Sequence, residues 1–223
     1  MTEITIYSAV ICPYAHRTRL ALLEKGITFD LIEIDLQNKP ANFIEISPYG
    51  KVPAIKHGQE KVWESAIINE YLEEVFPHPQ LLPQNPIARA QARIWVDFAN
   101  TRFVPTFSNL LRSLDTEQQK QAAQELYNHL QFIESEGLSK LSQNGPYWFG
   151  ESVSLVDLTF YPWFERWAVI EEYRGFKFPS EFTRIKNWWN AVSQRESVKA
   201  IANPKEFYLE RYARFASAPA TVN

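Results

Sequence analysis

Apolar and polar positions at the start of the chain follow two periods, one typical of strands and one typical of helices. Residues 4–8 alternate with a period of two, which predicts a strand. Cys12-Pro13 then begins a helical segment that Lys25-Gly26 ends, because proline suits the first turn of a helix and glycine its end. Residues 28–35 alternate again. A strand, a helix and a strand in this order predict a βαβ unit with parallel strands and a right-handed crossover.

Shorter elements complete this first part of the chain. A short helix is expected over residues 41–46, inside a loop. Two strands, residues 52–56 and 60–63, are separated by His57-Gly58-Gln59, which has the length and the glycine of a hairpin turn. An apolar-periodic helix follows over residues 66–75. The first part is therefore predicted to be an α/β domain.

Strand signals largely vanish after a proline-rich segment. Residues 76–86 hold four prolines among polar residues, which excludes a helix and indicates a linker. Helices are predicted beyond it, over residues 87–112 with a bend at Pro105, from Asp115 or Thr116 to about 141, from Ser154 through Trp167, over 180–194 and over 205–214, before a tail at 217–223 that we expect to be disordered. The pattern predicts an α/β domain at residues 1–77, a linker at 78–86 and an all-α domain at 87–223, each with its own core.

Ser154 and Asp157, three residues apart, invite comparison with a catalytic serine and acid. The same spacing at the start of an apolar helix is a capping box, with Val153 and Leu158 placed for a hydrophobic staple. We therefore assign the pair to folding rather than to chemistry.

Composition and charge exclude several classes of protein. The 223 residues are 45% hydrophobic and 22% charged, as in a globular protein with a substantial core. The net charge of −3, with both signs interspersed, gives no nucleic-acid footprint and no polybasic membrane patch. No secretory signal is expected, and no apolar run approaches the roughly 18 residues of a membrane span. The four histidines lack the spacing of a metal site, so we expect no metal.

Cys12 is the only cysteine in the sequence and the strongest candidate for chemistry. A lone cysteine excludes an intramolecular disulfide and fits a reducing compartment, which predicts a cytoplasmic protein. Most such cysteines are small buried hydrophobes. Cys12, however, precedes a proline at the start of a helix, where the macrodipole favours a thiolate. Arg17 and His16 lie nearby, and we expect His16 to be a partly exposed polar side chain.

Five motifs together resemble one family. CPYAHR at residues 12–17, NKP at 38–40, GKVPAI at 50–55, WESAII at 63–68 and SLVD at 154–157 occur in the order found in cytosolic glutathione transferases. The Cys-Pro pair is similar to the cysteine-type classes, namely omega, lambda and dehydroascorbate reductase. The resemblance covers essentially the whole chain. It implies a thioredoxin-like α/β N-terminal domain and an all-α C-terminal helical bundle, the glutathione transferase fold.

The resemblance also implies a glutathione site. Its catalytic residue is Cys12, and its glutathione-binding residues are Tyr14, Lys39, Val52, Pro53, Glu64 and Ser65. A cis Val52-Pro53 peptide would leave the Val52 backbone free to pair with the cysteinyl part of glutathione. Ser65 and the helix start would bind the γ-glutamyl carboxylate, Glu64 the ammonium group and Lys39 the glycyl carboxylate.

Structural alternatives stand beside several of these assignments. Ser65 in isolation is a helix N-cap, Glu64 a first-turn acid and Lys39 a solvated loop lysine. The high aromatic content, 14% with seven tryptophans, fits either core packing or an apolar ligand pocket. Five aromatic residues are candidates for the second-substrate pocket, and each could instead pack in the core: Phe103, Phe107, Trp163, Trp167 and Tyr208.

The predicted function is that of a glutathione-dependent thiol transferase or reductase. Cys12 would act on a glutathionylated substrate or on a glutathione adduct of dehydroascorbate, with glutathione as co-substrate. The alternatives are a ligand-binding protein with little turnover and a glutathione-dependent isomerase of the zeta type. The family resemblance implies a homodimer, with a monomer as the alternative, and a small disulfide or electrophile as second substrate.

Overall fold

The computed structural model describes residues 4–215, and the predicted disordered tail at 217–223 lies outside the described residues. The chain divides into two compact units, Met1–Leu82 and Pro83–Asn223, called here the N-terminal and C-terminal units. The division falls inside the segment interpreted as a linker. No helix among residues 4–215 is both long and apolar enough to span a bilayer.

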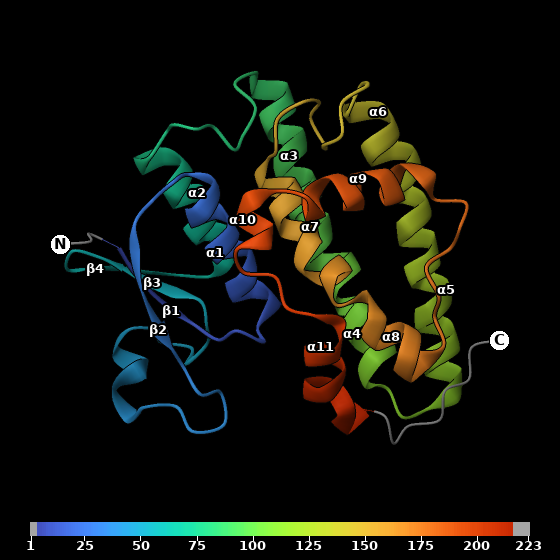
Figure 1. Cartoon of the computed structure of the whole chain (residues 1–223), viewed down its shortest axis with the longest axis horizontal. Coiled ribbons are helices and arrows are strands. Elements are labelled where there is room, and N and C mark those ends of the chain that lie inside the picture. The colour runs from blue at the N-terminus through green and yellow to red at the C-terminus, as the bar shows by residue number, and fades with distance from the viewer. Residues whose placement is uncertain (1–3, 216–223) are drawn as a thin grey trace. The chain divides into compact units, whose positions relative to one another are not determined.

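A four-stranded mixed sheet forms the frame of the N-terminal unit (Figure 1). Its strands are β1 (Ile4–Ser8), β2 (Phe29–Glu33), β3 (Ala54–His57) and β4 (Glu60–Trp63), in the order β2-β1-β3-β4. The β1 and β2 strands are parallel, with Ile6 opposite Leu31, as the βαβ pattern predicts. The β3 strand is antiparallel to both β1 and β4. The α/β prediction for this part is therefore confirmed.

Two α-helices and a short 3-10 helix complete the unit. They are α1 (Pro13–Glu24), α2 (Ser65–Val75) and η1 (Ala41–Glu45), and α1 packs on α2. Lys25 ends α1 and Gly26 follows with a φ of +63°, as the stop signal predicts. The β3 strand begins at Ala54 rather than at Val52, because Pro53 has no N–H to contribute to a ladder.

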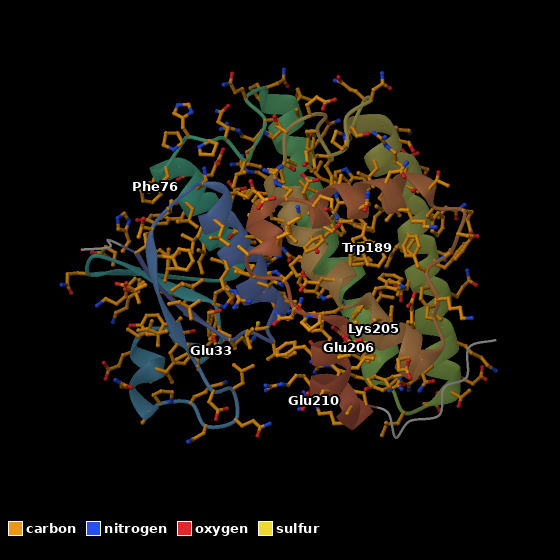
Figure 2. The ribbon with its side chains drawn as sticks, viewed as in Figure 1. Glu33, Phe76, Trp189, Lys205, Glu206 and Glu210 are labelled. Atoms are coloured by element: carbon orange, nitrogen blue, oxygen red, sulfur yellow. The ribbon has the colours of Figure 1, made fainter. Side chains whose placement is uncertain are left out.

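A buried ion pair fastens the chain that leaves α2. The Lys25 ammonium lies 2.6 Å from the Glu73 carboxylate and donates to the carbonyls of Phe76, labelled in Figure 2, and Pro79. Glu73 in turn accepts from the backbone N–H groups of Leu81 and Leu82. Because both charges are hydrogen-bonded as well as paired, their burial is compensated. The segment after α2 is thus irregular, as its prolines predict, yet held in place.

All the elements of the C-terminal unit among the residues described are helices or helical turns, which confirms the all-α prediction. Its elements are α3 (Pro86–Phe98), the π-helical turn η2 (Ala99–Phe103), α4 (Val104–Arg112), α5 (Thr116–Phe132), the π-helical turn η3 (Ile133–Leu138), α6 (Ser139–Leu141), α7 (Leu155–Glu165), α8 (Trp167–Arg174), α9 (Thr183–Ser193), α10 (Glu196–Lys199), α11 (Lys205–Tyr212) and the 3-10 turn η4 (Ala213–Phe215). Figure 1 shows α5 running beside α4, and the two helices are in contact.

A proline and an arginine side chain explain where two long predicted helices are interrupted. Pro105 cannot donate to the carbonyl four residues earlier, and the π-helical turn η2 ends two residues before it. The helix predicted from Ser154 through Trp167 breaks at Arg166. There the Arg166 guanidinium donates to the Pro162 carbonyl at 2.7 Å, while the Arg166 N–H bonds to Trp163 instead. The side chain therefore takes the carbonyl that a continuing helix would use.

Asp157 is the polar centre of the C-terminal core. The predicted capping box with Ser154 is present, and Asp157 is completely buried. Its carboxylate accepts from the Ser154 N–H at 2.7 Å, the Trp148 N–H at 3.1 Å and the Trp188 indole N–H at 2.8 Å. One carboxylate therefore ties the start of α7 to α9 and to the loop before α7. Aromatic rings pack around Phe164 of α7, which stacks on Trp167 and meets Trp189, labelled in Figure 2, edge-on.

We predict that Asp157→Ala lowers the free energy of unfolding of the C-terminal unit by about 3 kcal/mol, since it strands several buried donors. Urea unfolding followed by tryptophan fluorescence reports on this unit, because six of the seven tryptophans lie beyond residue 82. Asp97→Ala, at an exposed position of α3, is the matched control and should change the value by less than about 0.5 kcal/mol. Equal stability of the two variants would contradict the central role of Asp157.

Candidate active site

Cys12 stands at the junction between the first strand and the first helix. It is the N-cap residue of α1, with a φ of −78° and a ψ of 118°. Its N–H donates to the Ala9 carbonyl and its own carbonyl accepts the His16 N–H, both at 2.9 Å. Glu33, labelled in Figure 2 at the end of β2, accepts the Val10 N–H at 2.6 Å and so holds the loop that leads to Cys12. The thiol forms no disulfide and is partly exposed at the positive end of α1.

The Cys12 sulfur faces the backbone of Val52. Its Sγ lies 3.6 Å from the Val52 carbonyl oxygen, the geometry of a weak thiol hydrogen bond. Val52 precedes a cis peptide bond to Pro53, which confirms the expectation from the resemblance. A small apolar cluster fixes this arrangement: Ala9, Ala15, Ile34, Phe43 and Val52 are buried together, and Cys12 packs against them. The thiol and an extended piece of backbone are thus held side by side.

Glu64 and Ser65 join β4 to α2 in a strained conformation. Glu64 has a φ of +66° and a ψ of 108°, a region that residues with a side chain rarely adopt. Glu64, rather than Ser65, occupies the N-cap position, and its side chain makes no capping bond. The N-cap alternative for Ser65 is therefore wrong: Ser65 is the first residue of the helix, and its hydroxyl has another partner.

That partner is Arg17, from the second turn of α1. Its Nε and one terminal nitrogen donate to the Ser65 Oγ, at 2.9 and 2.6 Å. Both side chains are buried, each residue 3% exposed. Burial lowers the pKa of Arg17 to about 10, while Tyr14, Cys12 and Glu64 act in the opposite direction. The guanidinium stays charged at neutral pH, so a buried cation lies among the predicted site residues.

Tyr14 and Lys39 are more peripheral. Tyr14 is 39% exposed, and its ring centre lies 5.3 Å from the Arg17 guanidinium carbon, a cation–π distance. The Lys39 ammonium donates to the Gly50 carbonyl at 2.8 Å on an exposed loop. His16 is completely buried. The expectation of a partly exposed His16 is wrong, because the helix face that carries Cys12 turns into the interior one turn later.

Sequence reasoning therefore missed one partnership. All seven predicted catalytic and glutathione-binding residues belong to the N-terminal unit, where Arg17 joins them through Ser65. The motif CPYAHR contains Arg17, but no local pattern indicates a partner 48 positions away in the sequence.

The five predicted second-substrate residues all belong to the C-terminal unit and are buried there. Phe103 stacks on Phe164 and contacts Phe107, which in turn meets Trp167 edge-on. The Tyr208 hydroxyl donates to the Glu165 carboxylate, and Arg166 lies 4.5 Å from the Tyr208 ring centre. Their role in binding a substrate stays a prediction.

Comparison with known proteins identifies the family. The N-terminal domain of the glutathione S-transferases matches residues 11–75, and the C-terminal domain matches residues 92–191. Glutathione S-transferase omega-2 of Rattus norvegicus is 33% identical over 92% of this chain and 81% of its own length. The chain belongs to the glutathione transferase superfamily. Its omega-class relatives place it among the cysteine-type members, as the Cys-Pro motif predicts.

Solved structures agree with this assignment. The crystal structure of glutathione transferase Omega 3C from Trametes versicolor is 33% identical, with a TM-score of 0.85 over 96% of this chain and 91% of that one. Rice GST1 in complex with glutathione is 27% identical, with a TM-score of 0.85 over 95% and 97% of the two chains. The glutathione transferase fold and glutathione as co-substrate, both predicted from the motifs, are confirmed. Within residues 4–215, no group of three His, Cys, Asp or Glu side chains is placed to hold a metal.

The positive φ of Glu64 predicts that a glycine at this position stabilises the turn between β4 and α2. Glu64→Gly should raise the local free energy of opening around β4 and α2 by about 1 kcal/mol, because glycine adopts a positive φ without penalty. Native-state hydrogen exchange of peptides from residues 60–75 measures this quantity. Glu60→Gly, on the same edge strand in ordinary strand conformation, should instead lower it by about 0.5–1 kcal/mol. A loss of protection in both variants would show that Glu64 is not strained.

Proposed function

We propose that this glutathione transferase is a glutathione-dependent thiol transferase or reductase with Cys12 as its nucleophile. The observation that carries the proposal is the position of the chain's single cysteine: a partly exposed thiol, not in a disulfide, at the N-terminal end of α1 and against the Val52 carbonyl. A helix N-terminus favours the thiolate, which is the reactive form. The similarity to omega-class relatives supports the proposal.

The first step is thiol–disulfide exchange on a glutathionylated substrate. The Cys12 thiolate attacks the glutathione sulfur, a new S–S bond forms between Cys12 and glutathione, and the old S–S bond breaks. The substrate leaves as a thiolate, which takes a proton from solvent. With a glutathione adduct of dehydroascorbate, attack on the same sulfur breaks its bond to carbon, and the electron pair leaves with ascorbate.

The second step regenerates the enzyme. The thiolate of a further glutathione attacks the glutathione sulfur of the mixed disulfide, releasing oxidised glutathione and the Cys12 thiolate. Because the sequence holds no second cysteine, an intramolecular disulfide cannot resolve this intermediate. External glutathione is therefore the reductant, and the net reaction on a glutathionylated thiol consumes one glutathione and forms one oxidised glutathione.

Glutathione is proposed to lie along the residues that the motifs predict. The Val52 backbone pairs with its cysteinyl unit, Ser65 and the start of α2 receive the γ-glutamyl carboxylate, and Glu64 receives the ammonium group. Lys39 would have to leave the Gly50 carbonyl to reach the glycyl carboxylate. The rice protein that was solved with glutathione has a similar fold, which supports glutathione binding by this fold.

Two other functions would give different results in activity assays. In a ligand-binding protein, apolar compounds bind with no turnover of disulfides. In an isomerase of the zeta type, maleylacetone is converted with no net loss of glutathione. The position of Cys12 favours thiol transfer over both, because neither alternative needs a nucleophilic thiol at a helix N-terminus.

We predict that Cys12→Ala abolishes reduction of a hydroxyethyl disulfide–glutathione mixture and of dehydroascorbate, while wild type reduces at least one of them. Intact mass spectrometry of wild type after exposure to oxidised glutathione should show one added glutathionyl group, and Cys12→Ala should show none. Ser135→Ala, at an exposed position of the C-terminal unit, is the control variant and should behave as wild type.

Wild type that binds glutathione yet turns over neither substrate would overturn the proposed function. Activity that survives in Cys12→Ala would overturn the assigned nucleophile. Sedimentation equilibrium of the same sample separates the homodimer implied by the family from a monomer. We place the reaction in the cytoplasm, where glutathione keeps thiols reduced.

A further inference from the structure

Arg17 is a buried charged group that contacts a predicted glutathione-binding residue and has no role in the proposed mechanism. It is 3% exposed, and its Nε and one terminal nitrogen donate to the Ser65 hydroxyl. A cation in such a position is costly unless hydrogen bonds and negative charge compensate it. A hydroxyl supplies hydrogen bonds but no charge, so other groups must supply the remainder.

The Arg17 fork determines what the Ser65 hydroxyl can do. A serine oxygen has two acceptor lone pairs and one O–H donor. Two Arg17 nitrogens donate to this one oxygen, so both lone pairs point toward the guanidinium. The O–H must then be directed away from Arg17, as a donor to an acceptor. A carboxylate accepts hydrogen bonds and donates none, so Ser65 is set to receive that group.

Arg17 also acts on the thiol. The ionisable groups that interact with it are Cys12 and Tyr14 from α1 and Glu64 from the turn before α2, and each favours its charged form. Such an interaction is mutual, so the charge of Arg17 favours the Cys12 thiolate as much as the thiolate favours the cation. Tyr14, whose ring lies against the guanidinium, shields one side of this cation from water.

We propose that Arg17 is a positioning residue that serves both halves of the reaction: it orients the Ser65 hydroxyl toward the γ-glutamyl carboxylate and stabilises the Cys12 thiolate. The inference rests on the proposed function for the identity of the ligand, but the two effects on Ser65 and Cys12 are properties of the free protein. A single buried charge thereby links recognition of glutathione to reactivity of the thiol.

The role extends to the resolving step. When glutathione attacks the mixed disulfide, Cys12 is the leaving group, and a thiol that is more stable as thiolate leaves faster. Arg17 therefore assists formation of the Cys12–glutathione disulfide, by raising the thiolate fraction, and also its cleavage. Removal of the charge should slow both steps.

Three variants separate the two effects. Arg17→Lys keeps a positive charge but loses the fork, so it should raise the KM for glutathione about tenfold while the thiolate pKa changes little. Arg17→Gln loses the charge as well, and should also raise the thiolate pKa by about one unit, seen as a shifted pH profile of Cys12 alkylation by iodoacetamide. Ser65→Ala should raise the KM for glutathione and leave the alkylation profile unchanged.

Arg19→Gln is the matched control, since Arg19 is also buried in α1 but donates to the Val10 carbonyl. Its alkylation profile should match wild type. Equal profiles and equal KM values for Arg17→Gln and wild type would overturn the proposal, and so would equal losses in Arg17→Gln and Arg19→Gln. If Arg17→Gln does not fold, Arg17→Lys and Ser65→Ala still decide the Ser65 part, and the proposal fails if both keep the wild-type KM. Alkylation needs no turnover, so a wild type inactive on disulfides would overturn the proposed function and leave this result standing.

Discussion

One small apolar cluster holds the chemistry of the N-terminal unit together. Ala9 follows β1, Ala15 belongs to the first turn of α1, and Val52 precedes β3; all three belong to one buried cluster. Their packing brings the Cys12 sulfur to the Val52 carbonyl. A helix N-terminus favours a thiolate, and an extended backbone can pair with a peptide, but each is useful here only because the other is adjacent. A substitution that loosens this cluster would separate the nucleophile from the backbone proposed to orient its substrate.

The site stores free energy that the fold alone does not require. Glu64 adopts a positive φ, and Arg17 keeps a charge out of water while it donates to the Ser65 hydroxyl. Backbone strain and buried charge are typical of functional sites. An anionic ligand bound at Ser65 would be attracted by the Arg17 cation.

The sequence predicted those features that depend on residues close together in the chain. The Cys12-Pro13 helix start, the Lys25-Gly26 stop and the Ser154 capping box depend on neighbours within four residues, and each was predicted and is present. The burial of His16 and the Arg17–Ser65 contact depend on how α1 packs against α2, which no pattern within α1 records. The motif resemblance predicts Ser65 as a ligand residue but does not indicate the cation that donates to its hydroxyl.

A single cysteine places two demands on one surface under the proposed mechanism. The glutathionyl half of the mixed disulfide must be held firmly, so that its sulfur stays at Cys12, while the same sulfur must remain open to a second glutathione. A fully buried thiol would fail the second demand, and Cys12 is only partly buried. The same mechanism applies after oxidation of Cys12. A sulfenic acid on Cys12 has no second cysteine to condense with, so it would condense with the glutathione thiol to give the mixed disulfide and water. Under this mechanism bound glutathione reduces the mixed disulfide, the task of the resolving cysteine in a dithiol enzyme. The groups that bind glutathione therefore contribute to turnover as well as to affinity.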